Sequence, residues 1–99
     1  MQHSRRIIER LSIDDRAISL TSGALLLVER ADGPNEWEAI VTTAHPEPVD
    51  LGGYRLSLRL IDENSLGLED GTIDREDREL EGILVRQHDS TLVFRGLLG

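Results

Sequence analysis

The sequence predicts a single all-β domain, a small antiparallel barrel or sandwich of about six to eight short strands. Apolar and polar residues alternate without a break from Tyr54 to Leu60, which is typical of a strand with one buried face. A second alternating run extends from Trp37 to Ala44, and turn signals separate the apolar runs. The chain has 99 residues, the length of one domain, which we assign to residues 1–99.

The first element fits two structures. Ile7, Ile8 and Leu11 lie at helical spacing behind Ser4, which is a good helix N-cap. On a strand, Ile7, Leu11 and Ile13 would instead share the buried face, with Glu9 as the exception. We favour a hairpin over about residues 7–21, with one short N-terminal helical turn as the alternative at its start.

The next residues indicate strands joined by turns. Asp14-Asp15 favours a turn, and residues 16–21 then alternate again. Ala24 to Val28 is apolar at every position, which predicts a strand covered on both faces. Asp32-Gly33-Pro34-Asn35 is the clearest turn signal, and it leads into the strand that begins at Trp37.

Alternation also predicts the core. On each of two strands one set of residues should face inward: Trp37, Ala39, Val41 and Thr43 on the first, and Tyr54, Leu56, Leu58 and Leu60 on the second. Arg55 and Arg59 should face water.

The C-terminal part combines loops with two further strands. Residues 45–53 contain two prolines and two glycines and should form a loop. Residues 62–79 are acidic, and we expect Glu69 to Asp77 to be a mobile loop. Two strands, residues 80–87 and 91–98, should follow.

The formal charge is −8, and residues 62–81 alone carry nine acidic residues against two arginines. This charge argues against binding to nucleic acid, whose phosphates need cationic partners. All eleven basic residues are arginine, which we attribute chiefly to a GC-rich coding sequence. Four of them would form a basic stripe if their strands are neighbours, but arginines on the solvent face of a sheet are the ordinary outcome. These four are Arg55, Arg59, Arg86 and Arg95.

The chain contains no cysteine, which excludes disulfides, zinc-thiolate sites and thiol catalysis and favours a reducing compartment. No secretory signal follows the N-terminal residues, and no apolar run has the length of a membrane span. We therefore expect a cytoplasmic bacterial protein without membrane contact.

No catalytic constellation is evident. His88-Asp89-Ser90 brings together three residue types of a catalytic triad, but triad members come from separate parts of a fold, so we interpret it as a polar turn. His45 and Glu47 are two potential metal ligands, too few for a site. The prediction is therefore a protein without enzymatic activity and without a cofactor.

The acidic stretch suggests a cation site. Asp70-Gly71-Thr72-Ile73-Asp74 resembles the centre of an EF-hand calcium loop, but Leu66 and Leu68 then occupy two ligand positions without offering an oxygen. A different divalent-cation site within residues 69–77 remains an alternative, with these metal ligands: Asp70, Asp74 and Asp77, with Glu76 nearby.

A second ligand alternative comes from two short motifs. Arg6 and Arg10 form an Arg-x-x-x-Arg pair, and residues 62–67 approximate Asp-x-Ser-x-x-Gly. Together these motifs resemble the cyclic-dinucleotide signature of PilZ domains, which are small β-barrels. The resemblance implies that Arg6 and Arg10 contact the phosphates and a base of the ligand. Asn64 stands where the family has serine.

The expected function is accordingly a non-catalytic protein-interaction or self-association module. The partner would be another protein or a second copy of the chain. The strand from Ala24 to Val28 and the apolar end at residues 96–98 carry more apolar surface than a small barrel covers, which favours a twofold homodimer.

Overall fold

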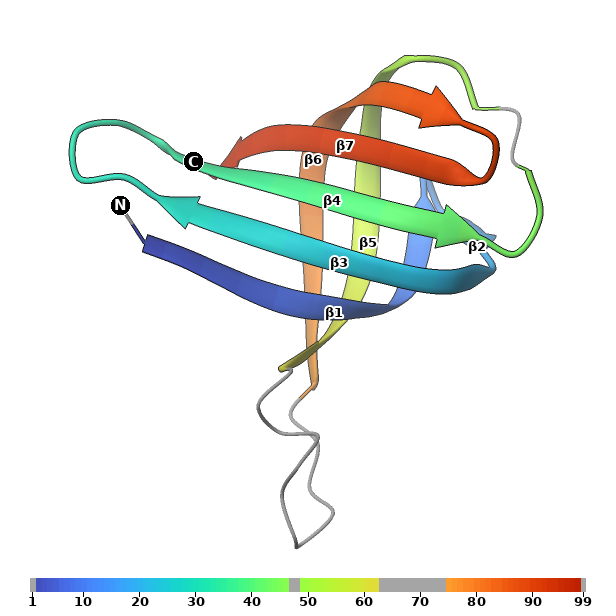
Figure 1. The fold of residues 1–99 in the computed structure, drawn as a ribbon, viewed down its shortest axis with the longest axis horizontal. Helices are drawn as coiled ribbons and strands as arrows, with labels where there is room; N and C mark the ends of the chain where they lie inside the picture. Colours follow the sequence, from blue (N-terminus) through green and yellow to red (C-terminus); the bar gives the residue numbers. More distant parts are fainter. Residues whose placement is uncertain (1, 47–48, 63–74, 99) are drawn as a thin grey trace, which may run out of the picture.

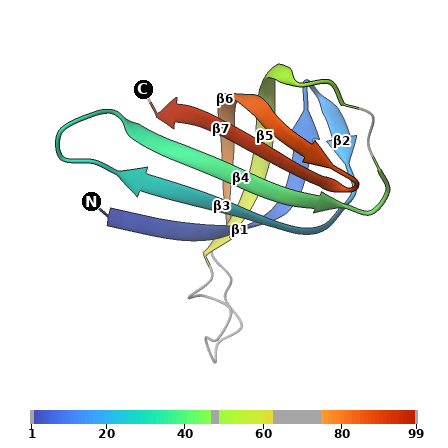
Figure 2. The same ribbon diagram turned by 45° about the horizontal axis from the view of Figure 1, so that its top comes forward.

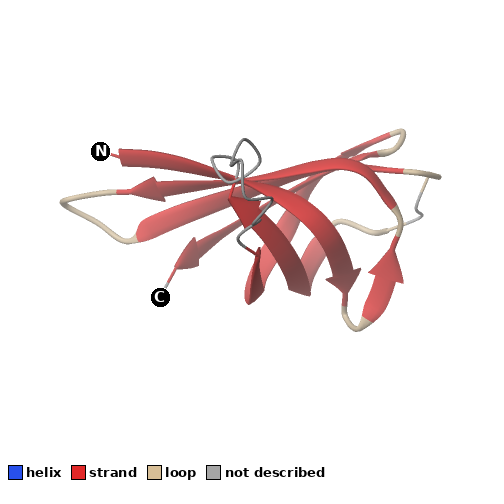
Figure 3. Cartoon of the chain, turned by 90° about the horizontal axis from the view of Figure 1, so that it is seen from below, coloured by secondary structure: helices blue, strands red, loops and turns tan. Residues whose placement is uncertain are grey.

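A computed structural model describes residues 2–46, 49–62 and 75–98, and these contain seven strands and no helix (Figure 3). No segment of the described chain is therefore a helix long and apolar enough to cross a membrane. The strands, in chain order, are β1 (Gln2–Ile13), β2 (Arg16–Ile18), β3 (Leu20–Glu29), β4 (Asn35–Thr43), β5 (Gly52–Asp62), β6 (Arg75–His88) and β7 (Thr91–Leu98).

The strands form an antiparallel barrel. The hydrogen-bonded order is β2-β1-β3-β4-β7-β6-β5, and β5 pairs back with β1 to close six of the strands into a barrel (Figure 1). The seventh strand, β2, adds to the second half of β1. Closure depends on the pairing of β1 with β5, from Arg6 opposite Asp62 to Ile13 opposite Leu56. The prediction of an all-β antiparallel fold is confirmed, and of its two architectures the barrel is the observed one.

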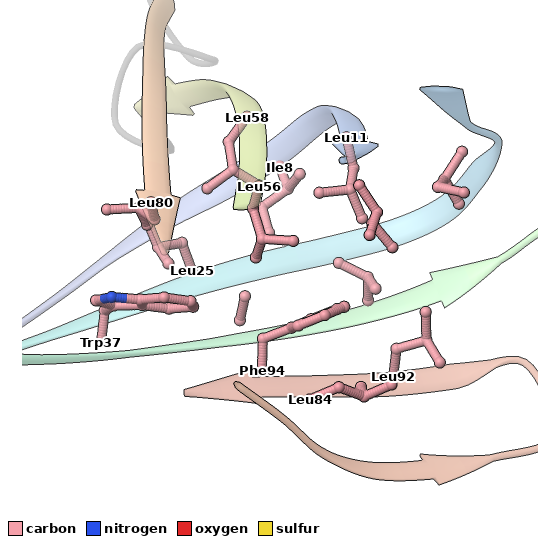
Figure 4. Close-up of a cluster of buried hydrophobic side chains, with 14 of the residues drawn as sticks. Ile8, Leu11, Leu25, Trp37, Leu56, Leu58, Leu80, Leu84, Leu92 and Phe94 are labelled. Carbon is pink, nitrogen blue, oxygen red and sulfur yellow. The ribbon is translucent and has the colours of Figure 1, made fainter. Parts of the chain in front are cut away.

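The core contains the residues that alternation placed there. Trp37, Ala39 and Val41 are buried on β4, and Leu56, Leu58 and Leu60 are buried on β5. Phe94 and Leu92 of β7 lie directly opposite Ala39 and Val41. Figure 4 shows Phe94 and Leu92 of β7 on one side of the interior and Ile8, Leu11, Leu56 and Leu58 of β1 and β5 on the other. Trp37 lies at one end of the cluster.

In the first strand Leu11 and Ile13 are buried as predicted, but Ile7 is not, and Ile8 takes its place in the core. Ile8 pairs with Leu60, but Arg10 pairs with Arg59, so Glu9 is an extra residue in β1. Such a β-bulge reverses the alternation at the point where it occurs. Ile8 and Leu11 therefore face the core together, and Ile7 does not belong to it. No helical turn is present in β1.

The acidic stretch also differs from expectation. Strand β6 begins at Arg75, earlier than the predicted residue 80, and pairs with β5 from its first residue. Arg75, Glu76 and Asp77 thus belong to a strand and not to a loop. The rest of the predicted mobile segment lies outside the described residues.

The turns agree with their sequence signals. Asp14, Asp15 and Asp89 have φ angles of 48°, 69° and 53°. Aspartate tolerates this left-handed backbone better than most residues because its short side chain bonds the nearby backbone. Asp14 also accepts a hydrogen bond from the backbone N–H of Arg55 at 2.9 Å, which fixes the β1–β2 turn against β5.

Candidate functional site

Large exposed apolar side chains gather on one outer face of the barrel. Of the five such residues in the described chain, Leu51 lies in a loop, and the other four lie on β4, β6 and β7: Ile40, Ile83, Val85 and Leu97. Pairing places Ala24 beside Ile40, and Ile40 beside Val93, so the apolar surface continues onto β3. We call this surface the outer apolar face. It consists of Ala24, Leu26 and Val28 on β3, Ile40 on β4, Ile83 and Val85 on β6, and Val93 and Leu97 on β7.

A groove of about 390 Å³ crosses one end of the outer apolar face. Val28, Ile83, Val85 and Leu97 contribute apolar walls, and Glu38 and Arg95 also line it. The carboxylate of Glu38 accepts a hydrogen bond from Nε of Arg95 at 2.6 Å. Glu38 and Arg95 therefore neutralise each other within the outer apolar face.

The arginines predicted on the solvent face do not form a basic stripe. Arg55 pairs with Asp15 at 2.8 Å, and Arg59 pairs with Asp77 at 2.9 Å. Arg95 pairs with Glu38, as above. A carboxylate thus neutralises three of the four arginines predicted on the solvent face. The fourth, Arg86, lies on β6 opposite Val93.

A second hollow lies where β6 and β7 separate. The last residues that pair between these strands are Ile83 and Arg95. Within the described residues, β6 up to Gly82 pairs only with β5. On the other side, the end of β7 from Gly96 to Leu98 pairs only with β4. A hollow of about 640 Å³ occupies this gap, which we call the open seam; its lining is Glu79–Ile83 of β6 and Arg95–Leu97 of β7.

Trp37 lies beneath the open seam. A Cβ atom added to Gly82 would be 2.4 Å from Cη2 and Cζ2 of the indole, and one added to Gly96 would be 2.6 Å from its Nε1. The indole edge thus extends between the two glycines, one on each strand. Trp37 is only 2% exposed, and its Nε1 has no hydrogen-bond partner among the described residues. The sequence signal for this site was a glycine within each of two predicted strands, which often marks a close approach.

The predicted cation ligands are not assembled in the described structure. Asp70 and Asp74 lie outside the described residues. Asp77 lies in β6 and accepts hydrogen bonds from Arg59 at 2.9 and 3.4 Å. No group of three carboxylate or imidazole side chains in residues 2–46, 49–62 and 75–98 is placed to hold a metal ion. The cation site stays a prediction, and Asp77 would have to leave Arg59 to join it.

The Arg59–Asp77 pair predicts a pH dependence. The hydrogen bond from Arg59, with its positive charge, lowers the pKa of Asp77 below the ordinary value of 3.8. A lowered carboxyl pKa means that the pair stabilises the fold at neutral pH and loses this contribution as the pH falls through the folded-state pKa. Asp77→Asn should therefore be slightly less stable than the wild type at pH 7 and equal to it near pH 2.

Urea unfolding of the two proteins across this range measures the effect. The side chains are exposed, so we expect a small difference at pH 7. If the difference in unfolding free energy between the wild type and Asp77→Asn stayed constant down to pH 2, this would contradict a role for the charged pair.

The two arginines of the PilZ-like motif point to different sides of β1. Arg6 lies opposite Leu25, which is fully buried, and shares the inward side with Ile8. The bulge at Glu9 places Arg10 on the outward side. Arg6 does lie opposite Asp62, the first residue of the second motif, and the motif's other residues lie outside the described chain. A shared ligand for Arg6 and Arg10 stays a prediction that this arrangement does not favour.

The histidine-containing motifs have simple positions. His88 is the last residue of β6, and Asp89 and Ser90 form the turn to β7; the side chains of His88 and Asp89 are exposed. The backbone carbonyl of Ser90 accepts a hydrogen bond from the backbone N–H of Thr43 at 2.8 Å. His45 is exposed, and Glu47 lies outside the described residues.

The geometry thus offers two adjoining surfaces for contact, the outer apolar face and the open seam, and Ile83 and Leu97 belong to both. Comparison with protein-family models, with curated proteins and with solved structures finds no match to this chain.

Proposed function

We propose that this domain is a non-catalytic module of a bacterial cytoplasmic protein and acts by protein–protein contact, with a second copy of the chain on its outer apolar face. The main support for this proposal is that four large apolar side chains, 39% to 62% exposed, lie together on this single face. Contiguous exposed apolar surface of this kind is typical of interaction sites, whereas single exposed apolar residues are not.

Charge supports a second copy as the occupant. The domain has a net charge of −8, so two copies repel each other at most approaches. On the outer apolar face, however, Glu38 and Arg95 neutralise each other, and at its edge Glu36 pairs with Arg30 at 3.0 Å. Two such faces can meet about a twofold axis without bringing unpaired carboxylates together. The absence of cysteine supports the reducing compartment.

The oligomeric state tests this proposal. Light scattering at high micromolar concentration should give a dimer for the wild type. Ile40→Glu places a charge within the face and should raise the dimer dissociation constant by at least about tenfold, because a buried carboxylate without a partner costs several kcal/mol.

Leu51→Glu is the matched control. Leu51 is 64% exposed but lies outside the face, so this variant should remain a dimer. A wild-type protein that is monomeric under these conditions would overturn the proposed self-association. Equal dissociation by both variants would show that net charge, and not the outer apolar face, controls assembly.

A further inference from the structure

The open seam leaves one edge of β6 without a neighbouring strand. Within the described residues, β6 pairs with β5 from Arg75 to Leu84, but with β7 only from Ile83 onward. The ends of β1, β3, β4 and β7 extend past β6 as a single layer (Figures 1 and 3). In the view of Figure 2, the early part of β6 also crosses behind β7 and does not run alongside it. A strand with one unpaired edge presents free N–H and C=O groups, which is the usual template for strand addition.

A buried donor points to the same place. Nε1 of Trp37 has no acceptor among the described residues, although Trp37 is 2% exposed. Buried polar groups are nearly always paired, and an unpaired one needs an explanation. The indole edge ends at Gly96 and Gly82, the glycines that line the open seam, so a backbone carbonyl entering the seam would be the acceptor.

The charges along this edge are negative and unbalanced. Glu79 and Glu81 project from the same side of β6 and line the open seam. Across on β5, Glu79 faces Ser57, which carries no charge, and Glu81 faces Arg55, whose guanidinium is bonded to Asp15 at 2.8 Å. Glu79 and Glu81 therefore lack a cation of their own.

We propose that the open seam binds an extended basic segment of a partner protein, which adds to the free edge of β6 as a further strand. Its side chains alternate, so basic residues would face Glu79 and Glu81, and a small apolar residue between them would face Leu80. The inner side of Gly82 is already filled by the indole of Trp37 and the carbonyl of Arg95. A second copy of this chain does not fit, because pairing β6 with β6 would bring like charges together. The inference rests on the proposed role in protein contact, but not on the self-association of the outer apolar face.

A model peptide provides the probe. We would titrate the protein with an acetylated and amidated octapeptide of alternating arginine and valine, and follow the backbone amides by NMR. Trp37 is the single tryptophan, so its indole N–H gives one resonance without ambiguity. We expect this resonance to move downfield and the amides of Glu79 to Gly82 to exchange more slowly with solvent when the peptide binds.

Two controls separate strand addition from simple charge attraction. The same peptide with alternate backbone nitrogens methylated keeps its charge but cannot form the ladder, so it should not bind. The double variant Glu79→Gln, Glu81→Gln should weaken binding about fivefold at low salt, with a smaller loss at high salt. The matched double variant Glu29→Gln, Asp32→Asn removes two exposed carboxylates elsewhere and should bind as the wild type does.

The outcomes distinguish this inference from the proposed dimer. Ile40→Glu should dissociate the dimer and still bind the peptide, whereas the Glu79, Glu81 variant should remain dimeric and bind it poorly. The inference is overturned if the octapeptide does not bind, if its methylated form binds equally well, or if the shifts fall away from β6 and Trp37. In each of those cases the acidic edge serves only to prevent strands of different molecules from pairing.

Discussion

Replacing Leu58 with alanine is expected to lower the free energy of unfolding by about 2–5 kcal/mol. Leu58 is 3% exposed, faces the barrel interior from β5 and lies opposite Leu11 of β1. The substitution removes buried methyl groups and leaves a cavity that neighbouring strands, fixed by their hydrogen bonds, cannot fill. For a domain whose total stability is on the order of 5–15 kcal/mol, this is a large loss.

Urea unfolding measured by tryptophan fluorescence tests this expectation. Ser57→Ala is the matched control, because Ser57 is the preceding residue and points to the other side of β5, opposite Ser12 and Glu79. It should change stability by less than about 0.5 kcal/mol. Equal effects from the two substitutions would mean that the assigned faces of β5 are wrong.

Gly82→Ala should cost about 3 kcal/mol, near the upper end for an overpacked core. The added Cβ would lie 2.4 Å from two carbon atoms of the Trp37 indole and 2.7 Å from the carbonyl oxygen of Arg95. The second contact is with backbone, so moving the indole alone does not relieve it. The strand β6 itself must shift.

The control for this substitution is Gly53→Ala. Gly53 also lies in a strand, but an added Cβ would meet only the Gly82 carbonyl oxygen at 4.0 Å, so we expect little effect or a slight gain in stability. Combining Gly82→Ala with Trp37→Phe should cost less than the sum of the two single losses, since the smaller ring removes part of the clash. Strict additivity would show that Trp37 does not determine the need for glycine at position 82.

The sequence predicted the inward-facing residues best in strands that have one face buried along their whole length. Strands β4 and β5 have this property, and their alternation identified their inward residues correctly. The bulge at Glu9 had only a weak local signal, a charged residue on the predicted apolar face of β1, and its position is defined by the pairing with β5. The first residues of β6 were missed for another reason: Arg75 to Glu79 are polar on both sides and show no alternation.

The candidate surfaces were less predictable because they arise from contacts between distant segments. Ala24 to Val28 and Leu97 were recognised as surplus apolar residues, but their union with Ile83 and Val85 depends on the strand order. The arginine–carboxylate pairs likewise join separate strands and turns, as Arg55 and Asp15 do. Asp77 was expected in a loop, and its pairing with Arg59 follows only from the extended start of β6.

Closure of the barrel has a consequence for how the chain folds. Strand β1 pairs with β5, and β4 with β7, across about half of the sequence, so much of the loop-closure entropy is lost before these contacts form. Of the seven described strands, β7 is synthesised last. Until it is present, β4 has β3 on one side only and exposes the face that carries Trp37. In a nascent chain that lacks β7 the sheet would therefore end at β4, and misassembly between chains would begin at that edge.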